Sequence, residues 1–211
     1  MPAARISLGH VQRIRIFGFW VIAVALGSML LFVQSGWEEI APFGIGIEDA
    51  IELFGIGLVG IAVTGRLWAT LYVGGRKSIQ LVQDGPYSVT RNPLYVFSTI
   101  GAFGVGMQAG SLIVGALAGV ITAFILLLTA RQEADFLRAE FGPAYEEYEK
   151  RVPMFFPKLS LYVEPETLQI LPRKLHSTLI DGAFFFLAFP VLELIEVFQE
   201  HGLLPVFFQP Y

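Results

Sequence analysis

The chain contains five stretches of mostly apolar residues, and a polypeptide with such stretches has few ways to fold. A helix needs about 20 apolar residues to cross the hydrocarbon core of a bilayer. The stretches lie at 16–34, 53–73, 94–109, 112–130 and 179–197. The last is interrupted by Asp181 and Pro190, so it either spans the membrane or lies in its interface. We expect an all-α fold, a polytopic transmembrane bundle of about five helices.

The composition narrows the class of protein further. Hydrophobic residues make up 55% of the 211 residues and charged residues 15%, whereas soluble domains usually carry about 25% charged residues. This excludes a disordered chain and a nucleic-acid-binding domain, and it disfavours an ordinary soluble enzyme. Cysteine is absent, and the three histidines, His10, His176 and His201, are widely separated. We therefore expect no metal site.

The basic residues predict the orientation of the chain in the membrane. If the five spans alternate in direction, all 14 Lys and Arg residues fall on one side. The other side carries Glu38, Glu39, Glu48, Asp49 and Glu200. Short loops rich in Lys and Arg stay in the cytoplasm. We therefore expect an integral, multi-pass protein whose N-terminus, 74–92 connection and 131–174 segment are cytoplasmic.

One sequence motif is misleading. The residues from Gly55 to Gly60 match the G-x-G-x-x-G dinucleotide fingerprint. That fingerprint requires a preceding strand and a helix N-terminus, and here it lies inside an apolar helix. We interpret these glycines, and the pairs Gly106/Gly110 and Gly115/Gly119, as positions that let helices approach closely.

The residues before the third span could bind an anion. Gly85-Pro86 is a turn, and Asn92-Pro93 is typical of the N-cap and first residue of a helix. A helix N-terminus is a natural seat for a carboxylate or phosphate, and Arg91 adds a positive charge. The alternative is a plain capped helix with an arginine that reaches the membrane interface.

A second group of candidate residues follows the fourth span. Glu133 shares a helix face with Thr129, while Arg131 points the other way. Glu133 either accepts hydrogen bonds from a ribose or an amine, or is simply solvated. The next helix begins after Phe141-Gly142-Pro143 and carries Tyr145 and Tyr148 on one face. These rings could attract a sulfonium or serve as interfacial aromatics; we expect Glu146, Glu147 and Glu149 to form a solvated face.

Two blocks of sequence together resemble a known family. The first is Gly85-x-Tyr87-x-x-x-Arg91-Asn92-Pro93-x-Tyr95, and the second is Glu133 followed by Phe141-Gly142-x-x-Tyr145-x-x-Tyr148-x-x-Arg151-Val152-Pro153 and Pro157. They are similar to integral-membrane methyltransferases, which include isoprenylcysteine carboxyl methyltransferases and phospholipid N-methyltransferases. The resemblance covers about Ile79 to Pro157.

The resemblance implies a cytoplasmic helical segment that binds S-adenosylmethionine and a lipophilic or lipid acceptor taken from the bilayer. It implies three parts: membrane helices over 1–73, a methyltransferase core over 74–157, and a C-terminal extension over 158–211. By motif position, Arg91 and Glu133 would be the catalytic residues. The cofactor-binding residues would be Ile79, Gln80, Leu81, Val82, Tyr87, Asn92, Pro93, Leu94, Tyr95, Glu133, Tyr145 and Tyr148.

The sequence also departs from the family pattern. The family usually has His at the position of Asn92 and a second Glu at the position of Ala134, and prenylcysteine enzymes carry Arg at the position of Thr129. Asn cannot exchange a proton near neutral pH, so no histidine base is available there. The first interpretation is an isoprenylcysteine carboxyl methyltransferase-like enzyme. The alternatives are a phospholipid N-methyltransferase and a non-catalytic or reductase-like relative.

Overall fold

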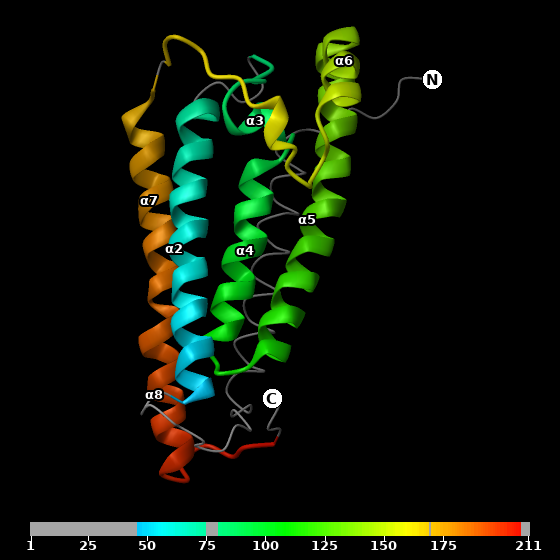
Figure 1. The fold of residues 1–211 in the computed structure, drawn as a ribbon. Coiled ribbons are helices and arrows are strands. Elements are labelled where there is room, and N and C mark those ends of the chain that lie inside the picture. Colours follow the sequence, from blue (N-terminus) through cyan, green and yellow to red (C-terminus); the bar gives the residue numbers. More distant parts are fainter. Residues whose placement is uncertain (1–45, 75–79, 169, 208–211) are drawn as a thin grey trace.

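The computed structural model describes residues 46–74, 80–168 and 170–207, and this part of the chain is helical without strands (Figure 1). It therefore confirms the expected all-α fold. The elements are α2 (Ile47–Val73), α3 (Pro86–Val89), α4 (Pro93–Met107), α5 (Leu112–Phe141), α6 (Pro143–Arg151), the 3-10 helix η1 (Leu159–Leu161), α7 (Pro172–Phe186) and α8 (Ala188–Glu200).

Three helical segments are long and apolar enough to cross a membrane. They are α2, α5 and the segment Pro172–Gln199 that comprises α7 and most of α8, whereas α4 is a shorter apolar helix of 15 residues. The expected span at 16–34 lies outside the described residues. The last span begins earlier than expected and is interrupted at Leu187. Pro190 explains the interruption, because proline lacks an N–H and its ring clashes with the carbonyl four residues earlier.

The helix boundaries follow local signals in the sequence. Ser111 caps α5, since its hydroxyl accepts a hydrogen bond from the Val114 N–H at 3.4 Å. Gly142 ends α5 and begins α6 with φ 53°, a left-handed conformation that glycine adopts without strain. Only four residues separate α4 from α5, so the two helices form the tight antiparallel hairpin that the sequence predicts.

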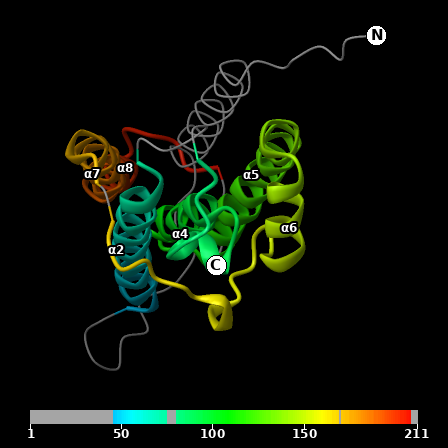
Figure 2. The same ribbon diagram turned by 90° about the horizontal axis from the view of Figure 1, so that it is seen from above.

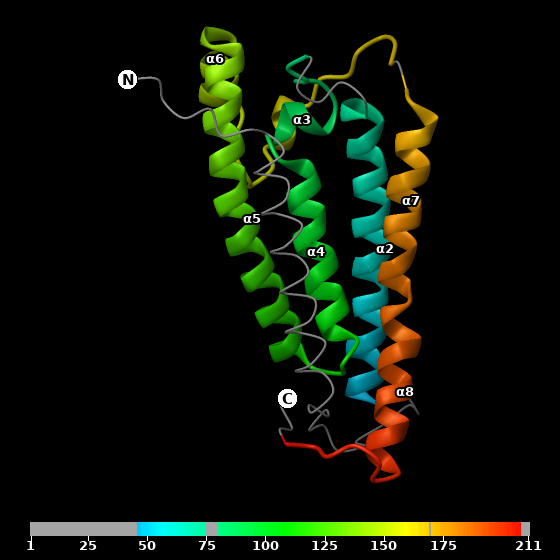
Figure 3. The same cartoon turned by 180° about the vertical axis from the view of Figure 1, so that it is seen from behind.

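Helix α4 is the centre of the bundle. Seen from above, it lies between α2 and α5, while α7 and α8 flank the far side of α2 (Figure 2). The view from behind shows α7 and α8 following α2 along its length (Figure 3). Gly55 of α2 and Gly104 of α4 make the close approach possible, because a Cβ at Gly55 would lie 2.6 Å from the Gly104 carbonyl oxygen.

Arg66 lies inside the membrane-spanning helix α2, where an isolated charge would be costly. Its guanidinium donates a hydrogen bond to the Ser98 hydroxyl of α4. It also lies over the Phe185 ring of α7, with 5.9 Å between Cζ and the ring centroid. Arg66 therefore joins three helices rather than facing lipid.

The basic residues gather at one end of the bundle, where acidic residues also occur. The end with the start of α4, α6 and the start of α7 carries Arg91, Lys150, Arg151, Lys158, Arg173 and Lys174. The end with the start of α2 and the end of α8 carries Glu48, Asp49, Glu193 and Glu196. The shared end of these basic residues agrees with the alternation of spans from which the orientation was predicted.

Replacing Gly55 by Ala should destabilise the packing of α2 against α4. We expect the free energy of unfolding in detergent to fall by about 1–3 kcal/mol, the usual cost of overpacking. Gly57→Ala is the matched control, because among the described residues nothing lies within 4 Å of a Cβ at Gly57. Equal stability of the two variants would contradict this account of the helix contact.

Candidate functional site

Two connecting segments pair with each other at the basic end of the bundle. One is residues 85–92, which contain α3, and the other is residues 152–163, here called the strap. Three backbone hydrogen bonds join them: the N–H groups of Gly85, Arg91 and Lys158 donate to the carbonyls of Val163, Pro153 and Val89 at 2.7, 2.9 and 2.9 Å. The strap therefore fixes the entry of the chain into α4.

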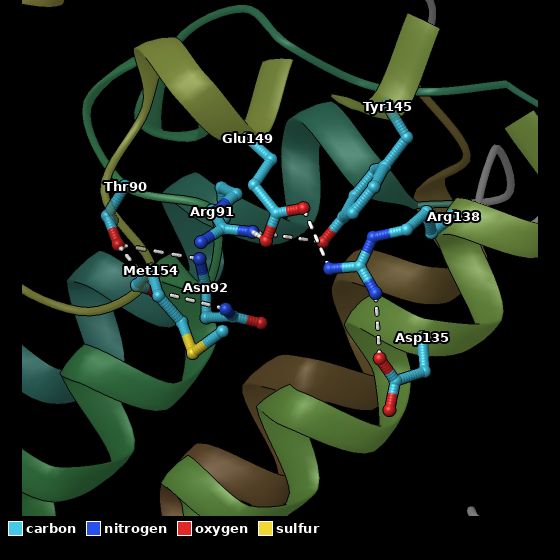
Figure 4. Close-up of polar contacts among 8 residues, drawn as sticks. All are labelled: Thr90, Arg91, Asn92, Asp135, Arg138, Tyr145, Glu149 and Met154. Carbon is cyan, nitrogen blue, oxygen red and sulfur yellow. Dashed lines mark hydrogen bonds and ion pairs between the residues drawn. The ribbon is translucent and has the colours of Figure 1, made fainter. Parts of the chain in front are cut away.

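Asn92 occupies the N-cap position of α4, but its side chain does not cap the helix. Its Nδ2 atom donates instead to the Met154 carbonyl of the strap at 3.0 Å (Figure 4). The Thr90 hydroxyl lies 3.3 and 3.2 Å from the carbonyl oxygens of Met154 and Phe155. The amide oxygen of Asn92 points away from Met154 in this view, so the side chain can still accept a hydrogen bond.

Arg91 belongs to an ionic network that links the segment before α4 to α6 and α5. Its Nη1 atom donates to Glu149 Oε1 at 2.7 Å and to the Tyr145 hydroxyl at 3.3 Å. Arg138 donates to Glu149 Oε2 and to Asp135 Oδ1, each at 2.8 Å (Figure 4). Glu149 therefore bridges two arginines. The prediction that this residue belongs to a solvated face of α6 is wrong.

Helical spacing in the sequence distinguishes Glu149 from the two glutamates beside it. Glu149 lies four residues after Tyr145 and therefore shares its helix face, which is the buried face of α6. Glu146 and Glu147 are exposed, as expected. The three glutamates are the same residue type in one short helix, and only the helix face on which each lies distinguishes them.

The Arg91 side chain keeps one unused donor. It is only 9% exposed, and its Nε atom is buried with no hydrogen-bond partner among the described residues. A buried donor without a partner is costly, particularly on a charged group. Arg91 could therefore hold an additional anionic or carbonyl oxygen without giving up Glu149.

The four predicted tyrosines are all buried near this network. Tyr87, Tyr95, Tyr145 and Tyr148 are 8%, 7%, 2% and 3% exposed. The Tyr148 hydroxyl donates to the Tyr87 carbonyl at 2.8 Å, and the rings of Tyr145 and Tyr148 pack edge to face at 6.0 Å. In this conformation Tyr145 and Tyr148 belong to the packed core beside Ala134 and Val152, so a ligand would reach them only if the rings became exposed.

Glu133 lies on the inner side of α5, near Tyr87. It is half-buried, whereas Arg131 is exposed, as the helical spacing predicts. Burial raises the pKa of Tyr87 well above its ordinary value, and the neighbouring Tyr148, Glu133 and Tyr95 raise it further. The Tyr87 phenol is therefore neutral at physiological pH, and these four predicted residues lie near one another.

The remaining predicted residues differ in their surroundings. Leu81 packs against the Tyr145–Tyr148 cluster, and Val82 and Leu94 pack around Tyr72 and Tyr87. Pro93 is buried at the first turn of α4, while Gln80 is exposed. Ile79 lies outside the described residues. The structure thus brings most of the predicted set to the junction of α3, α4, α5 and α6.

A cavity of about 370 Å³ lies on another side of the α3–α4 junction. Its lining is almost entirely apolar and includes Trp68 of α2, Pro93 and Phe97 of α4, and Leu159 and Tyr162 in or beside η1. Pro93 also belongs to the predicted cofactor set. The sequence alone does not predict this cavity, because its walls come from α2, from α3 and α4, and from residues 157–162, three parts of the chain that only the fold brings together.

Comparison with known proteins identifies the family. The phospholipid methyltransferase family model matches residues 53–144. The cobalt-zinc-cadmium resistance protein CzcN of Cupriavidus metallidurans is 35% identical over 188 residues, which cover 89% of this chain and 84% of that protein. The chain belongs to the phospholipid and isoprenylcysteine methyltransferase family. This confirms the resemblance seen in the sequence.

Two further similar proteins have different names from each other. The nickel-cobalt-cadmium resistance protein NccN of Alcaligenes xylosoxydans xylosoxydans is 32% identical, over 90% of this chain and 87% of that protein. The protein-S-isoprenylcysteine O-methyltransferase of Schizosaccharomyces pombe is 34% identical over 77 residues, 36% of this chain and 33% of that enzyme. No solved structure matches significantly. Within the described residues, no group of three or more His, Asp or Glu could hold a metal ion.

Replacing Glu149 by Gln should destabilise the junction in a pH-dependent way. The hydrogen bond from Arg138, and then Arg91, hold the pKa of Glu149 below its ordinary value of 4.5. A depressed pKa contributes stability that is present above pH 4.5 and is lost as the pH falls through the folded value.

We therefore expect E149Q to lower the free energy of unfolding at pH 7 by about 1–3 kcal/mol, and the difference from wild type to shrink in acid. Chemical denaturation in detergent at both pH values measures this. Glu147→Gln, at an exposed position of the same helix, should behave as wild type. A loss for E149Q that persisted unchanged in acid would contradict the ionic role.

Proposed function

We propose that this protein is a membrane-embedded methyltransferase that transfers the methyl group of S-adenosylmethionine to a lipophilic acceptor. The observation that carries the proposal is the convergence of Glu133, Tyr87, Asn92 and Arg91 at one junction in a chain of this family. In the sequence, Glu133 lies more than 40 positions after the other three residues. The helix hairpin and the strap bring them together.

The residues at the junction have the chemistry that such a cofactor requires. Glu133 is an acceptor for the ribose hydroxyls or the amino group of the methionine moiety. The unused Nε–H of Arg91 and the N-terminus of α4 suit the methionine carboxylate. Tyr87 and Tyr95 offer aromatic surface to the adenine and the sulfonium. Glu149 and Arg138 hold Arg91 in place.

The cofactor supplies an activated methyl group, and the protein has to orient the acceptor and exclude water. Asn92 cannot take up a proton near neutral pH, and the neutral phenol of Tyr87 is a donor rather than a base. An acceptor that is already anionic, such as a carboxylate, needs no base. A neutral amine also attacks directly and releases its proton to solvent afterwards. These two acceptor classes are compatible with the groups present.

Isoprenylcysteine carboxyl methylation is our first assignment, and phospholipid N-methylation is the second. The family model that matches is named for phospholipid methyltransferases, and Thr129 stands where prenylcysteine enzymes carry an arginine. The Thr129 hydroxyl is used within the helix, donating to the Ile125 carbonyl at 3.0 Å. Incubating the purified chain with labelled cofactor and each lipid class separates the two assignments.

The names of two relatives suggest a cellular context. Both are named for resistance to divalent metals. We propose that this chain would contribute to such resistance through methylation of a membrane component, as its family suggests. A host complemented with Glu133→Ala should then be as metal-sensitive as one that lacks the protein.

Glu133→Ala should abolish or strongly weaken binding of S-adenosylmethionine. Loss of a hydrogen-bonded carboxylate should reduce affinity by about tenfold or more, measured by calorimetry in mild detergent. Glu140→Ala is the matched control, since Glu140 is exposed on the same helix. Equal affinity of both variants, with both proteins folded, would place the cofactor elsewhere. No binding by the wild type would favour the non-catalytic or reductase-like alternative.

The basic end of the bundle should face the cytoplasm, together with the cofactor junction. The chain has no cysteine, so single cysteines report accessibility without background. In intact cells, a membrane-impermeant maleimide should label Leu203→Cys, near the acidic end, and not Lys150→Cys on α6. The reverse pattern would overturn the proposed orientation.

A further inference from the structure

The apolar cavity at the α3–α4 junction faces away from Glu133. On α4 its lining residues are Pro93, Val96 and Phe97, which share one helix face because they are three and four residues apart. Tyr95 points elsewhere and packs against Leu126 and Ala130 of α5. The cavity therefore lies between α2, α4 and η1, outside the junction that we assign to the cofactor.

The lining of the cavity offers almost nothing to a polar ligand. Val89, Thr90 and Pro93 are buried, and no charged residue contributes to the lining. The Thr90 hydroxyl is already directed at the strap carbonyls of Met154 and Phe155. The Trp68 ring contacts the rings of Phe97 and Tyr162, with centroid distances of 6.5 and 6.0 Å. The interior thus suits a hydrocarbon.

The mouth of the cavity lies on the side of the strap and η1. Leu159 is 77% exposed and Tyr162 is 42% exposed, although both line the cavity. Between the lining residues Pro157 and Leu159 stands Lys158, whose side chain is exposed. Its backbone N–H is held by the Val89 carbonyl, so the backbone of Lys158 is fixed beside the mouth. An apolar interior with a cation at its mouth complements an anionic amphiphile.

We propose that this cavity binds the hydrocarbon chain of a single-chain anionic amphiphile, with its head group beside Lys158. The cavity falls in the size range of small-molecule sites, roughly 300–1,000 Å³. Trp68 on its wall belongs to α2, a helix that is apolar and long enough to cross a membrane, so the cavity borders a membrane-spanning segment. This site goes beyond methyl transfer and does not depend on it, since Pro93 is the one lining residue shared with the proposed cofactor site.

Trp68 provides a direct test, because it lines the cavity. Trp20 and Trp37, the other two tryptophans of the chain, are replaced by Phe so that Trp68 is the single fluorophore. The purified full-length protein in detergent is titrated with a fatty acid brominated on its chain, since bromine quenches tryptophan at short range. We expect saturable quenching.

Two variants in the single-tryptophan background make the test specific. Val96→Phe fills the cavity and should weaken binding at least about tenfold, or about 1.4 kcal/mol. Val120→Phe adds the same volume on α5 at a position that is 67% exposed, and it should bind as the parent does. If V96F fails to fold, Leu159→Asp at the exposed mouth replaces it, with the same expected loss because a charge opposes entry of the chain.

Each result decides the proposal. Quenching that does not saturate would overturn the proposed site for the hydrocarbon chain. So would equal quenching of the blocking variant, V96F or L159D, and the control V120F. An alkylammonium of the same brominated chain that binds as tightly as the fatty acid would overturn the assignment of an anionic head group. Calorimetry with S-adenosylmethionine on the same samples separates the two proposals, because cofactor binding should be unchanged when the chain site is blocked.

Discussion

The backbone pairing between residues 85–92 and the strap is the interaction on which the functional end of this molecule depends. Helices α4 and α5 are fixed relative to each other by a four-residue connection, but that connection lies at the opposite end of the bundle. At the basic end, the hydrogen bonds of Gly85, Arg91 and Lys158 to the strap hold α3 in place. Both candidate sites are built on this pairing, one on each side of it.

A second constraint comes from burying Arg91. A guanidinium that is nine-tenths buried needs a compensating charge, and Glu149 supplies it from α6. Glu149 also takes a hydrogen bond from Arg138 on α5, so the short helix α6 is tied to both of its neighbours. This arrangement leaves the Nε–H of Arg91 unused. This buried N–H group is the feature of the site that most directly favours binding of an anionic ligand.

Much of the fold could be predicted from the sequence because membrane helices are specified by local features. Each of these features determines the structure at its own position in the chain. They are the apolar runs, Ser111 before α5, Gly142-Pro143 between α5 and α6, and the glycines of α2 and α4. The dinucleotide-like motif was correctly rejected, since Gly55 packs against Gly104 inside a helix pair. The late proline at position 190 was noted, but the break that it causes at Leu187 was not predicted.

The contacts that build the site could not be predicted in the same way. Asn92 occupies the predicted N-cap position, yet its side chain donates to the Met154 carbonyl, because the fold brings the strap within reach of the amide. The pairing of Arg91 with Glu149 joins residues 58 positions apart, and no local pattern encodes it. The cavity depends on how α2, α4 and η1 meet. Such features arise from tertiary packing rather than from motifs.

The most direct measurement of the central claim is to locate bound S-adenosylmethionine by photo-crosslinking. Purified protein would be irradiated with labelled cofactor, and the labelled peptides identified by mass spectrometry. The account predicts an adduct that is lost with excess unlabelled cofactor and that lies within residues 85–95 or 129–148. A competable adduct confined to α2 or to α7–α8, or none on folded protein, would contradict it.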